Sequence, residues 1–422
     1  MAPEQPFDGV TVVEFGQFVA VPFCAQLLAD GGARVIKIET LAGDPVRRLM
    51  PVAPGETRIF LSRNRGKRSL PLDLRHPEAP AVIDGLLRSA DVAVMNFRPG
   101  LAEEHGLDPA TLQTKYPRLI IGQVTPFGRS GPDALRAGMD IVVQARSGLM
   151  VANGRSTDGR PAQGDPVSAD YMCAMTLAFG LASALLRRER TGQGGVVHTS
   201  LMQAALTLNN NQMLRIDSLD REAQEATMSN LGQQRQDGAS YPVIRANLPS
   251  TRPSPMFRVY FRTYDTADGW IAVACGSHGL RERFLRATGL TDDQLEANAE
   301  EVPEAHYAEM EAEAEHLFAS RSTAEWELAL WAAGVPVSEV KFPFELFDDE
   351  QAAASGMFHD LAHPSLGNVR VLAPPVSLDA DGFRGRGRSE PLGSETRALL
   401  SEIGFSQAEA ERLIASGVTR EG

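Results

Sequence analysis

An aspartate that precedes a long apolar run is the first candidate for chemistry in this sequence. Asp170 stands directly before Tyr171–Arg187 (YMCAMTLAFGLASALLR), which is apolar nearly all round and typical of a buried helix. An aspartate at this place can cap the helix by accepting backbone N–H groups. The helix dipole and the same N–H groups would also keep the carboxylate ionised, and an ionised carboxylate beside an electrophilic carbonyl is a nucleophile. From the residues alone, both roles stay open.

Two further segments are candidates for binding a ligand. The stretch that begins RNRGKRS carries five cations within thirteen residues and could bind a phosphorylated ligand; they are Arg63, Arg65, Lys67, Arg68 and Arg75. Asn96–Gly100 (NFRPG) follows a predicted strand, where open α/β sheets present ligand contacts. The structural alternatives are a solvated basic loop for the first segment and a Pro-Gly turn for the second.

Several familiar catalytic patterns do not occur in the sequence. The first predicted strand–helix turn keeps only Gly16 of the G-x-G-x-x-G pattern, which argues against a dinucleotide cofactor. There is no Walker A sequence and no G-x-S-x-G elbow, and the eight histidines lack metal-ligand spacing. His359 and His363 are four apart, but Pro364 argues against a helical pair. We therefore expect no metal and no permanently bound cofactor.

Alternating strand and helix patterns must position these residues. The strand candidates are Val10–Phe15, Arg34–Glu39, Asp91–Phe97 and Leu119–Val124, and the helix candidates between them are Val19–Ala29, Pro77–Ser89 and Pro109–Lys115. Strand–helix–strand units of this kind pair in parallel with right-handed crossovers. The pattern predicts a doubly wound α/β domain whose ligands bind beyond the carboxyl ends of the strands.

The composition sets broad limits on function. The chain has 422 residues and a formal net charge of −13, which argues against nucleic acid or an anionic membrane as its main partner. We expect no stretch long and apolar enough to span a membrane, and the N-terminus has no signal-peptide pattern. Cys24, Cys173 and Cys275 lie in apolar neighbourhoods and are typical of reduced core thiols. These features favour a cytoplasmic protein.

Several of these stretches together resemble one known family. The stretches are FDGVTVVEFGQFVAVPFCAQLLADGGARVIKIE, NRGKRSLPLDL, ADVAVMNFRPG, GMDIVVQARSGLM and SADYMCAMTLAFGLASALLRRERTGQGGVVHTSLMQA. They resemble the class III (CaiB/BaiF) CoA-transferases, which include formyl-CoA and carnitine CoA-transferases and, as relatives, the α-methylacyl-CoA racemases. The resemblance runs nearly end to end and is strongest over residues 7–204.

The resemblance implies a fold and an assembly. It implies a Rossmann-like large domain built from both chain ends, an inserted small α+β domain, and two chains interlocked as a homodimer. On this sequence we place the first part of the large domain at 1–215, an irregular polar linker at 216–256, the small domain at 257–335, and a return linker with the rest of the large domain at 336–422.

The resemblance also implies a reaction and a set of site residues. The family's nucleophilic aspartate falls on Asp170, which would pass through an aspartyl anhydride and an aspartyl–CoA thioester while CoA moves from an acyl-CoA to a carboxylic acid. CoA, a substrate here, would contact Gln17, Val19, Ala20, Leu72, Asp73, Leu74, Arg75, Asn96, Phe97, Arg98 and Asp140.

The sequence departs from the family pattern at several positions. Glu104 and Thr40 stand where members often have CoA-binding arginines, and Asn247–Met256 (NLPSTRPSPM) replaces a Gly-rich active-site loop, which puts oxalate specificity in doubt. A small dicarboxylic acyl-CoA, with transfer between or within molecules, is compatible with the pattern. Arg47 and Arg48 could pair with a substrate carboxylate, although we favour solvated surface for them.

Two alternatives remain beside the transferase. A racemase of the related type needs a proton-carrying histidine before the Asp of G-H-D-I, and here that place is Met139 in Gly138–Ile141 (GMDI). The other alternative is a non-catalytic CoA-binding homologue, which would not need a carboxylate at Asp170.

Overall fold

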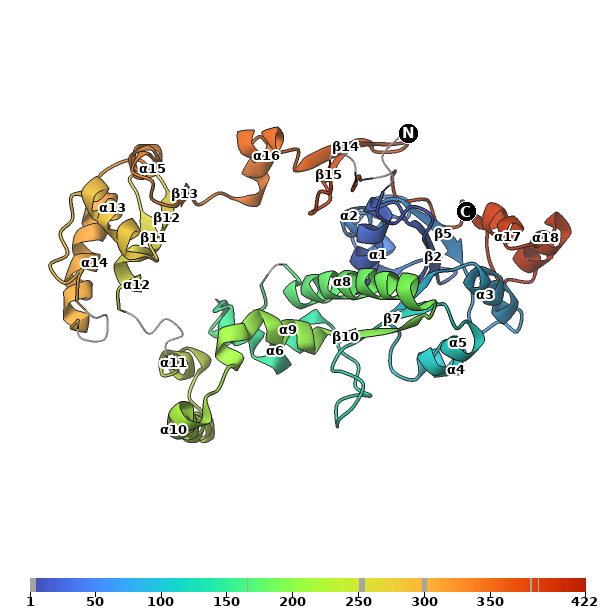
Figure 1. Ribbon diagram of the computed structural model, residues 1–422, viewed down its shortest axis with the longest axis horizontal. Helices are drawn as coiled ribbons and strands as arrows, with labels where there is room; N and C mark the ends of the chain where they lie inside the picture. Colours follow the sequence, from blue (N-terminus) through green and yellow to red (C-terminus); the bar gives the residue numbers. More distant parts are fainter. Residues whose placement is uncertain (1–4, 165, 250–254, 298–301, 380–381, 386) are drawn as a thin grey trace. The chain divides into compact units, whose positions relative to one another are not determined.

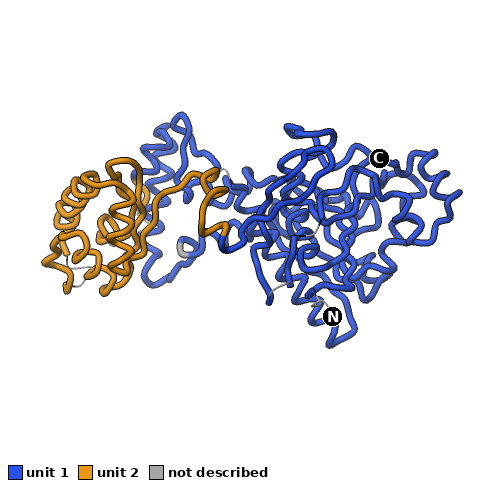
Figure 2. The backbone as a smooth tube through the Cα atoms, turned by 90° about the horizontal axis from the view of Figure 1, so that it is seen from above, with its two compact units in different colours: residues 1–246, 354–422 blue, residues 247–353 orange. Residues whose placement is uncertain are grey.

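The protein divides into two compact units. The computed structural model describes residues 5–164, 166–249, 255–297, 302–379, 382–385 and 387–422. One unit comprises residues 1–246 and 354–422, and the other comprises residues 247–353 (Figures 1 and 2). Both ends of the chain therefore belong to the same unit.

A six-stranded parallel sheet forms the centre of the larger unit. Its strands are β1 (Thr11–Phe15), β2 (Arg34–Glu39), β5 (Lys67–Pro71), β6 (Val92–Met95), β7 (Ile120–Thr125) and β10 (Gly195–Ser200). The strand order is β10-β7-β6-β1-β2-β5, so the chain first adds strands on one side of β1 and then crosses to the other. The order reverses between β1 and β6, which opens a crevice at the carboxyl ends of these strands. The predicted α/β fold is confirmed.

Helices cover both faces of this sheet (Figure 1). One face carries α1 (Ala20–Asp30), α6 (Asp140–Ser147), α8 (Ser168–Thr191) and α9 (Leu201–Asn209), and the other carries α3 (Ala79–Arg88), α4 (Leu101–Glu104), α5 (Pro109–Lys115), α17 (Thr396–Glu402) and α18 (Gln407–Ala415). The strands supply alternate side chains to the two cores, since Val92 and Val94 lie in one and Ala93 and Met95 in the other.

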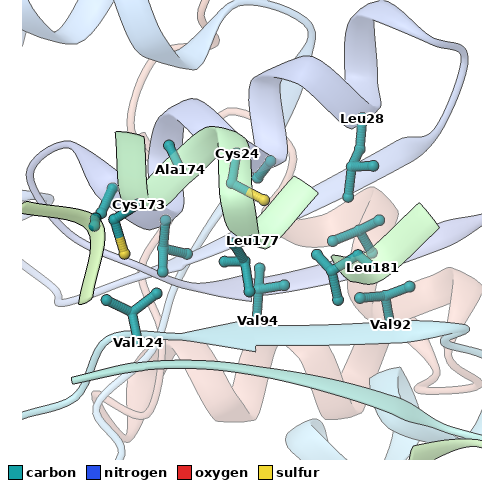
Figure 3. Close-up of a cluster of buried hydrophobic side chains, with 14 of the residues drawn as sticks. Cys24, Leu28, Val92, Val94, Val124, Cys173, Ala174, Leu177 and Leu181 are labelled. Carbon is teal, nitrogen blue, oxygen red and sulfur yellow. The ribbon is translucent and has the colours of Figure 1, made fainter. Parts of the chain in front are cut away.

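Helix α8 packs its apolar residues against the first of these cores. Cys173, Ala174, Leu177 and Leu181 are buried beside α1 and the sheet (Figure 3). By length and composition alone, the same helix could cross a membrane. The expectation that the chain has no stretch of this kind was therefore wrong. A core helix has the same composition, because both environments reward apolar side chains. All three cysteines are buried free thiols, as expected.

A buried ionic cluster joins β1, β2 and β5. Lys37 Nζ is 2.8 Å from Glu14 Oε1 and 3.0 Å from Asp44 Oδ2, and it donates to the carbonyl of Gly16 at 2.7 Å. Lys67 Nζ is 2.8 Å from Glu14 Oε2 and donates to the carbonyl of Pro22 at 2.7 Å. Because Gly16 begins the turn after β1 and Pro22 lies in the first turn of α1, the two lysines hold both ends of this β1–α1 segment.

Arg47 is part of a neighbouring buried pair. Its Nε and Nη2 donate to the two carboxylate oxygens of Glu39 at 2.7 and 2.8 Å, and its guanidinium lies 3.7 Å from the ring centre of Phe60. Arg47 is therefore neither solvated nor free for a substrate carboxylate, and both interpretations of it were wrong. Arg48 is exposed, as favoured.

The stretch expected to be an irregular linker contains helices. Helix α10 (Asp217–Gln236) spans 20 residues and α11 (Tyr241–Ala246) follows it, and neither has a buried residue. The expectation of irregular backbone was wrong there, because a helix without a buried apolar face shows no hydrophobic periodicity in its sequence.

The smaller unit has its own sheet and core. Its elements are α12 (Phe257–Tyr260), β11 (Phe261–Asp265), β12 (Trp270–Ala274), α13 (His278–Thr288), α14 (Glu304–Phe318), α15 (Thr323–Ala332) and β13 (Val337–Glu339). The strands form an antiparallel sheet in the order β11-β12-β13. Tyr264 stacks on Phe318, which also contacts Phe284 and Trp326. Since β13 pairs with β12, this unit extends past the boundary that we placed at residue 335.

The remaining described elements are short. They are η1 (Pro45–Arg48), β3 (Pro51–Ala53), β4 (Glu56–Thr57), α2 (Arg58–Asn64), α7 (Leu149–Ala152), β8 (Ser156–Thr157), β9 (Arg160–Pro161), η2 (Asn210–Met213), η3 (Pro343–Phe347), α16 (Glu350–Ala354), β14 (Phe358–His363) and β15 (Gly367–Leu372).

The buried Arg65–Asp30 pair gives a test of the larger unit. Arg65 Nε donates to Asp30 at 2.9 Å, and burial raises the pKa of Asp30 even with this partner. Replacing Arg65 by Met should lower the free energy of unfolding by about 3–5 kcal/mol at pH 7, because it leaves a buried carboxylate uncompensated. Urea unfolding measures this. Arg65→Met/Asp30→Asn should recover most of the loss and the exposed Arg58→Met should cost little, whereas full stability of Arg65→Met would contradict the account.

Candidate active site

A cavity of about 710 Å³ opens at the carboxyl ends of the central strands. The turns after β1, β2, β5, β6 and β7 line it together with the N-terminal ends of α8 and α9. Ten of the twelve predicted site residues line this cavity, namely Gln17, Ala20, Leu72, Asp73, Leu74, Arg75, Asn96, Phe97, Arg98 and Asp170. Val19 is buried at the start of α1, and Asp140 lies behind Asp170.

The turn after β1 is tied to the turn after β6. The backbone N–H of Gln17 donates to Asn96 Oδ1 at 3.0 Å, and Asn96 Nδ2 donates to the carbonyl of Gln17 at 2.9 Å. Phe18, with φ of 66°, holds a left-handed conformation that is costly for a residue with a side chain. The structure keeps this strained turn where it forms the cavity wall, which is a feature of binding and catalytic sites.

Asp170 is placed by a second aspartate. It is the third residue of α8, whose N-cap is Val167, and the cap position makes no side-chain hydrogen bond. Asp140, the first residue of α6, supplies the carboxylate instead, since its Oδ2 accepts the backbone N–H of Asp170 at 3.0 Å. The interpretation of Asp170 as the cap was therefore wrong, and Asp140 serves the free N–H group.

The environment of Asp170 opposes its ionisation. Burial, and after it the nearby carboxylate of Asp140, raise the pKa of Asp170 to about 7 against the opposing charge of Arg63. The expectation that the helix N-terminus keeps Asp170 fully ionised was wrong, because desolvation and the like charge outweigh the helix dipole. Near neutral pH both the acid and the carboxylate are populated. The carboxylate form is poorly stabilised by its surroundings, which favours reaction with an electrophile.

Arg63 and Tyr171 form a pair beside Asp170 that sequence reasoning missed. Arg63 Nε and Nη2 donate to the hydroxyl of Tyr171 at 3.2 and 2.9 Å. Arg63 belonged to the segment predicted to bind phosphate, and its adjacency to the residue after Asp170 has no signal in the sequence.

The rest of that basic segment does not form a phosphate-binding loop. Arg65 and Lys67 are buried with Asp30 and Glu14, and Arg68 pairs with Glu395 and Glu402. Of its five cations only Arg75 lines the cavity, and its side chain is 86% exposed. Three of the five cations of the segment pair instead with carboxylates on other elements of the larger unit.

Other basic side chains lie at or near the cavity. Arg98 and His105 line it, and the exposed Arg420 of the C-terminal tail donates to the carbonyl of Leu41, which also lines it. Sequence reasoning missed Arg420 because 379 residues separate it from Leu41. Thr40, a departure from the family pattern, lies in the lining beside Leu41, whereas Glu104 is exposed at the end of α4.

Three remaining expectations concern Met139, the segment that replaces the Gly-rich loop of the family, and metal binding. Met139 lines the cavity and is 53% exposed. The stretch Asn247–Met256 lies partly outside the described residues. Within the described residues, Asp292, Asp293 and His306 of the smaller unit are close enough to share a metal ion, but Asp292 already accepts from Tyr260 and pairs with His306.

Comparisons with known proteins agree with one another. The chain matches the model of CoA-transferase family III over residues 7–396. It is 29% identical over 417 residues to the cinnamoyl-CoA:phenyllactate CoA-transferase of Clostridium sporogenes, covering 96% of this chain and 95% of that protein. It is 30% identical over 418 residues to the succinate–glutarate CoA-transferase of Agrobacterium fabrum, and the match covers 94% of this chain and 96% of that protein.

Solved structures give the same result. The crystal structure of Rv3272 from Mycobacterium tuberculosis is 28% identical with a TM-score of 0.76, covering 95% of this chain and 100% of that one. The crystal structure of a CAIB/BAIF family protein from Brucella suis is 27% identical with a TM-score of 0.74, and the match covers 95% of this chain and 100% of that one.

The raised pKa of Asp170 should appear in the pH dependence of stability. The folded state binds this proton up to about pH 7 and the unfolded state only up to about pH 4, so ionisation destabilises the fold as pH rises between these values. Asp170→Asn should therefore raise the free energy of unfolding at pH 8 by up to about 4 kcal/mol and change little at pH 4.

Urea unfolding from pH 4 to pH 8 measures this difference. Asp140→Asn should weaken the pH dependence of the wild type, because it removes the like charge beside Asp170. A gain from Asp170→Asn that is the same at both ends of the range would show that the carboxyl is not destabilised by ionisation.

Proposed function

The chain belongs to CoA-transferase family III, and from that premise we propose that Asp170 carries the transferred groups as a covalent nucleophile. The protein is a transferase whose substrates are CoA thioesters and carboxylic acids. One observation carries the proposal: a carboxyl with its pKa raised to about 7 lines the end of a cavity large enough for an extended cofactor-sized ligand.

We place CoA along the turns that line this cavity. Arg75 and Arg98 present exposed guanidinium groups at its rim, where they can meet phosphates while staying solvated. The apolar lining around Leu72, Leu74 and Phe97 suits the pantetheine chain. The thioester then lies beside Asp170.

The proposed reaction has four balanced acyl transfers. An Asp170 carboxylate oxygen attacks the thioester carbonyl, the C–S bond breaks, and an aspartyl–acyl anhydride and CoA thiolate form. The thiolate attacks the aspartyl carbonyl of the anhydride, which releases the donor carboxylate and leaves an aspartyl–CoA thioester. The acceptor carboxylate attacks this thioester and releases the thiolate, and the thiolate takes the acceptor acyl group from the second anhydride. Asp170 is regenerated as a carboxylate.

Asp140 would assist by position and by charge. Its bond to the backbone N–H of Asp170 fixes the first turn of α8, and its charge destabilises the Asp170 carboxylate in the free enzyme. Acylation removes the negative charge of Asp170, so the repulsion between the two carboxylates is relieved when the anhydride forms.

The two alternatives account less well for the site. Racemisation at this place needs a proton carrier, and the thioether of Met139 cannot take up or release a proton. A protein that only binds CoA gains nothing from a destabilised carboxyl at the thioester end of the cavity. Covalent transfer uses this carboxyl directly.

We also propose that the chain acts as an interlocked homodimer in the cytoplasm. Helix α8 exposes Met175, Phe179 and Leu186 on its outer side, and a second chain would bury these apolar side chains. Three free buried thiols are consistent with a reducing compartment.

Light scattering of the full chain should give twice the 45.6 kDa of one chain, and the mass of a single chain would contradict this assembly.

Removing the Asp170 carboxylate tests the function. Asp170→Ala should lower kcat for transfer by about 1,000-fold or more, because no other group forms the covalent intermediates. Calorimetric titration with CoA should still show binding, since the proposed CoA contacts lie on other turns. Asp170→Asn serves as the isosteric control and should be equally inactive. Transfer at the wild-type rate by either variant would contradict the proposal.

A further inference from the structure

Asp140, which accepts the backbone N–H of Asp170, is itself held by a buried glutamine. Gln144 is fully buried one turn later in α6, and its Nε2 donates to Oδ1 of Asp140. The other oxygen of Asp140, Oδ2, accepts from the backbone of Asp170 at 3.0 Å. We call Asp140 and Asp170 the aspartate pair. Gln144 and Asp140 are not among the described residues that line the cavity, so any effect of Gln144 on the reaction passes through the pair.

Two N–H donors therefore face the carboxyl of Asp140. A carboxylate accepts on both oxygens, whereas a protonated carboxyl would direct an O–H donor at one of these N–H groups. Asp140 is only 4% exposed, so the two N–H groups stand in place of the water that would otherwise hydrate its charge. Hydrogen bonds to a carboxylate are charge-assisted and stabilise the charged form. Gln144 thus holds Asp140 in its negatively charged form.

The orientation of the Gln144 amide points to the same role. Its Oε1 is buried with no hydrogen-bond partner among the described residues, so the bond from Nε2 to Asp140 is what favours this orientation. A buried amide oxygen without a partner lowers the stability of a fold, and an apolar side chain at this place would avoid that cost. The property that only the amide supplies here is the donor to Asp140.

Helix α6 is held at both ends, which fixes Asp140 relative to Asp170. Its first residue, Asp140, is bonded to the backbone of α8. Its last residue, Ser147, accepts on its carbonyl oxygen from Nδ2 of Asn209 in α9 at 3.1 Å. Moving Asp140 away from Asp170 would break these bonds, so the folded protein retains the repulsion within the aspartate pair.

Few other charges face the aspartate pair among the described residues. Helices α7 and α9 pack against α6 and contain no titratable side chain. At the start of α8, Tyr171 accepts from Arg63, the cation that opposes the raised pKa of Asp170. Burial raises the pKa of the Cys173 thiol to about 12, so this thiol stays uncharged. Arg146 of α6 is exposed. The distribution of charge within the pair therefore depends mainly on the donors that each carboxyl has.

The two carboxyls of the aspartate pair differ in these donors. The carboxyl of Asp140 has two, and that of Asp170 has none among the described residues. We propose that Gln144 is a positioning residue for the reaction, which keeps the negative charge of the pair on Asp140 and leaves Asp170 to take up the proton. Of two interacting carboxyls, the one that binds the proton more tightly is the more basic, and a more basic carboxylate is the better nucleophile. This inference rests on the proposed role of Asp170 and adds the residue that sets its basicity.

The pH profile of kcat/KM for transfer tests the inference. Attack needs the Asp170 carboxylate, so the wild-type rate should fall as the pH drops below about 7. Gln144→Met keeps the length of the side chain and removes the donor, which lets the proton of the pair pass to Asp140. The acid limb of the profile should then lie about one pH unit lower, and kcat/KM at pH 8 should be about 10-fold lower because Asp170 is less basic.

Two further variants control this measurement. Gln203→Met, the same substitution at an exposed glutamine of α9, should leave the profile unchanged. Asp140→Asn should shift the acid limb as Gln144→Met does, and the double variant should shift it no further, because both act through one charge. Thermal unfolding shows whether each variant folds, and Asp140→Asn alone carries the test if Gln144→Met does not fold.

The contrary outcomes separate this inference from the role of Asp170. The inference is overturned if Gln144→Met lowers kcat/KM by the same factor at every pH, or if Asp140→Asn leaves the acid limb in place. It is also overturned if the shifts of the two variants add in the double variant, because the glutamine would then act by another route. In each of these cases Asp170 remains the nucleophile, whereas full transfer by Asp170→Ala would contradict the proposed function itself.

Discussion

A single buried carboxylate, that of Glu14, holds the floor of the active site together. It bridges Lys37 and Lys67, which come from the two strands on one side of β1. These lysines donate to the carbonyl of Gly16 in the turn after β1 and to that of Pro22 in the first turn of α1. That turn carries Gln17, and the reciprocal bonds of Gln17 with Asn96 join it to the strand on the other side of β1. The crevice where the strand order reverses thus has a rigid base, against which a long thioester can be held.

The charges in this structure divide into two groups with different consequences. Beneath the sheet each buried cation has an internal carboxylate, so these pairs stabilise the fold and take no part in binding. Asp170 forms no described ion pair, and burial and the like charge of Asp140 raise its pKa to about 7 although the charge of Arg63 opposes this. Ionisation of Asp170 therefore lowers the stability of the fold, and the acylation that we propose would remove the negative charge that causes this.

The sequence predicted the sheet, because alternating apolar strands and the turns that follow them are local patterns. Asn96–Gly100 was expected at the ligand-binding edge for this reason, whereas the residues after β1 and β5 were expected there from the family resemblance, and residues of all three turns line one cavity. Contacts between distant segments were not predictable. The basic segment at 63–68 was taken for a phosphate site because the carboxylates that neutralise it lie on other elements, and Asp140 was not expected to serve the N–H of Asp170 from 30 residues away. Helix α10 was missed because it has no buried face.

Direct trapping of an acylated Asp170 tests the central claim. The enzyme is incubated with an acyl-CoA and hydroxylamine in the absence of an acceptor acid, and its peptides are then analysed by mass spectrometry. The account predicts progressive inactivation and a hydroxamate on the peptide that contains Asp170, because hydroxylamine attacks the anhydride or thioester formed there. An enzyme that stays fully active with an unmodified Asp170, or a hydroxamate on another residue, would contradict it.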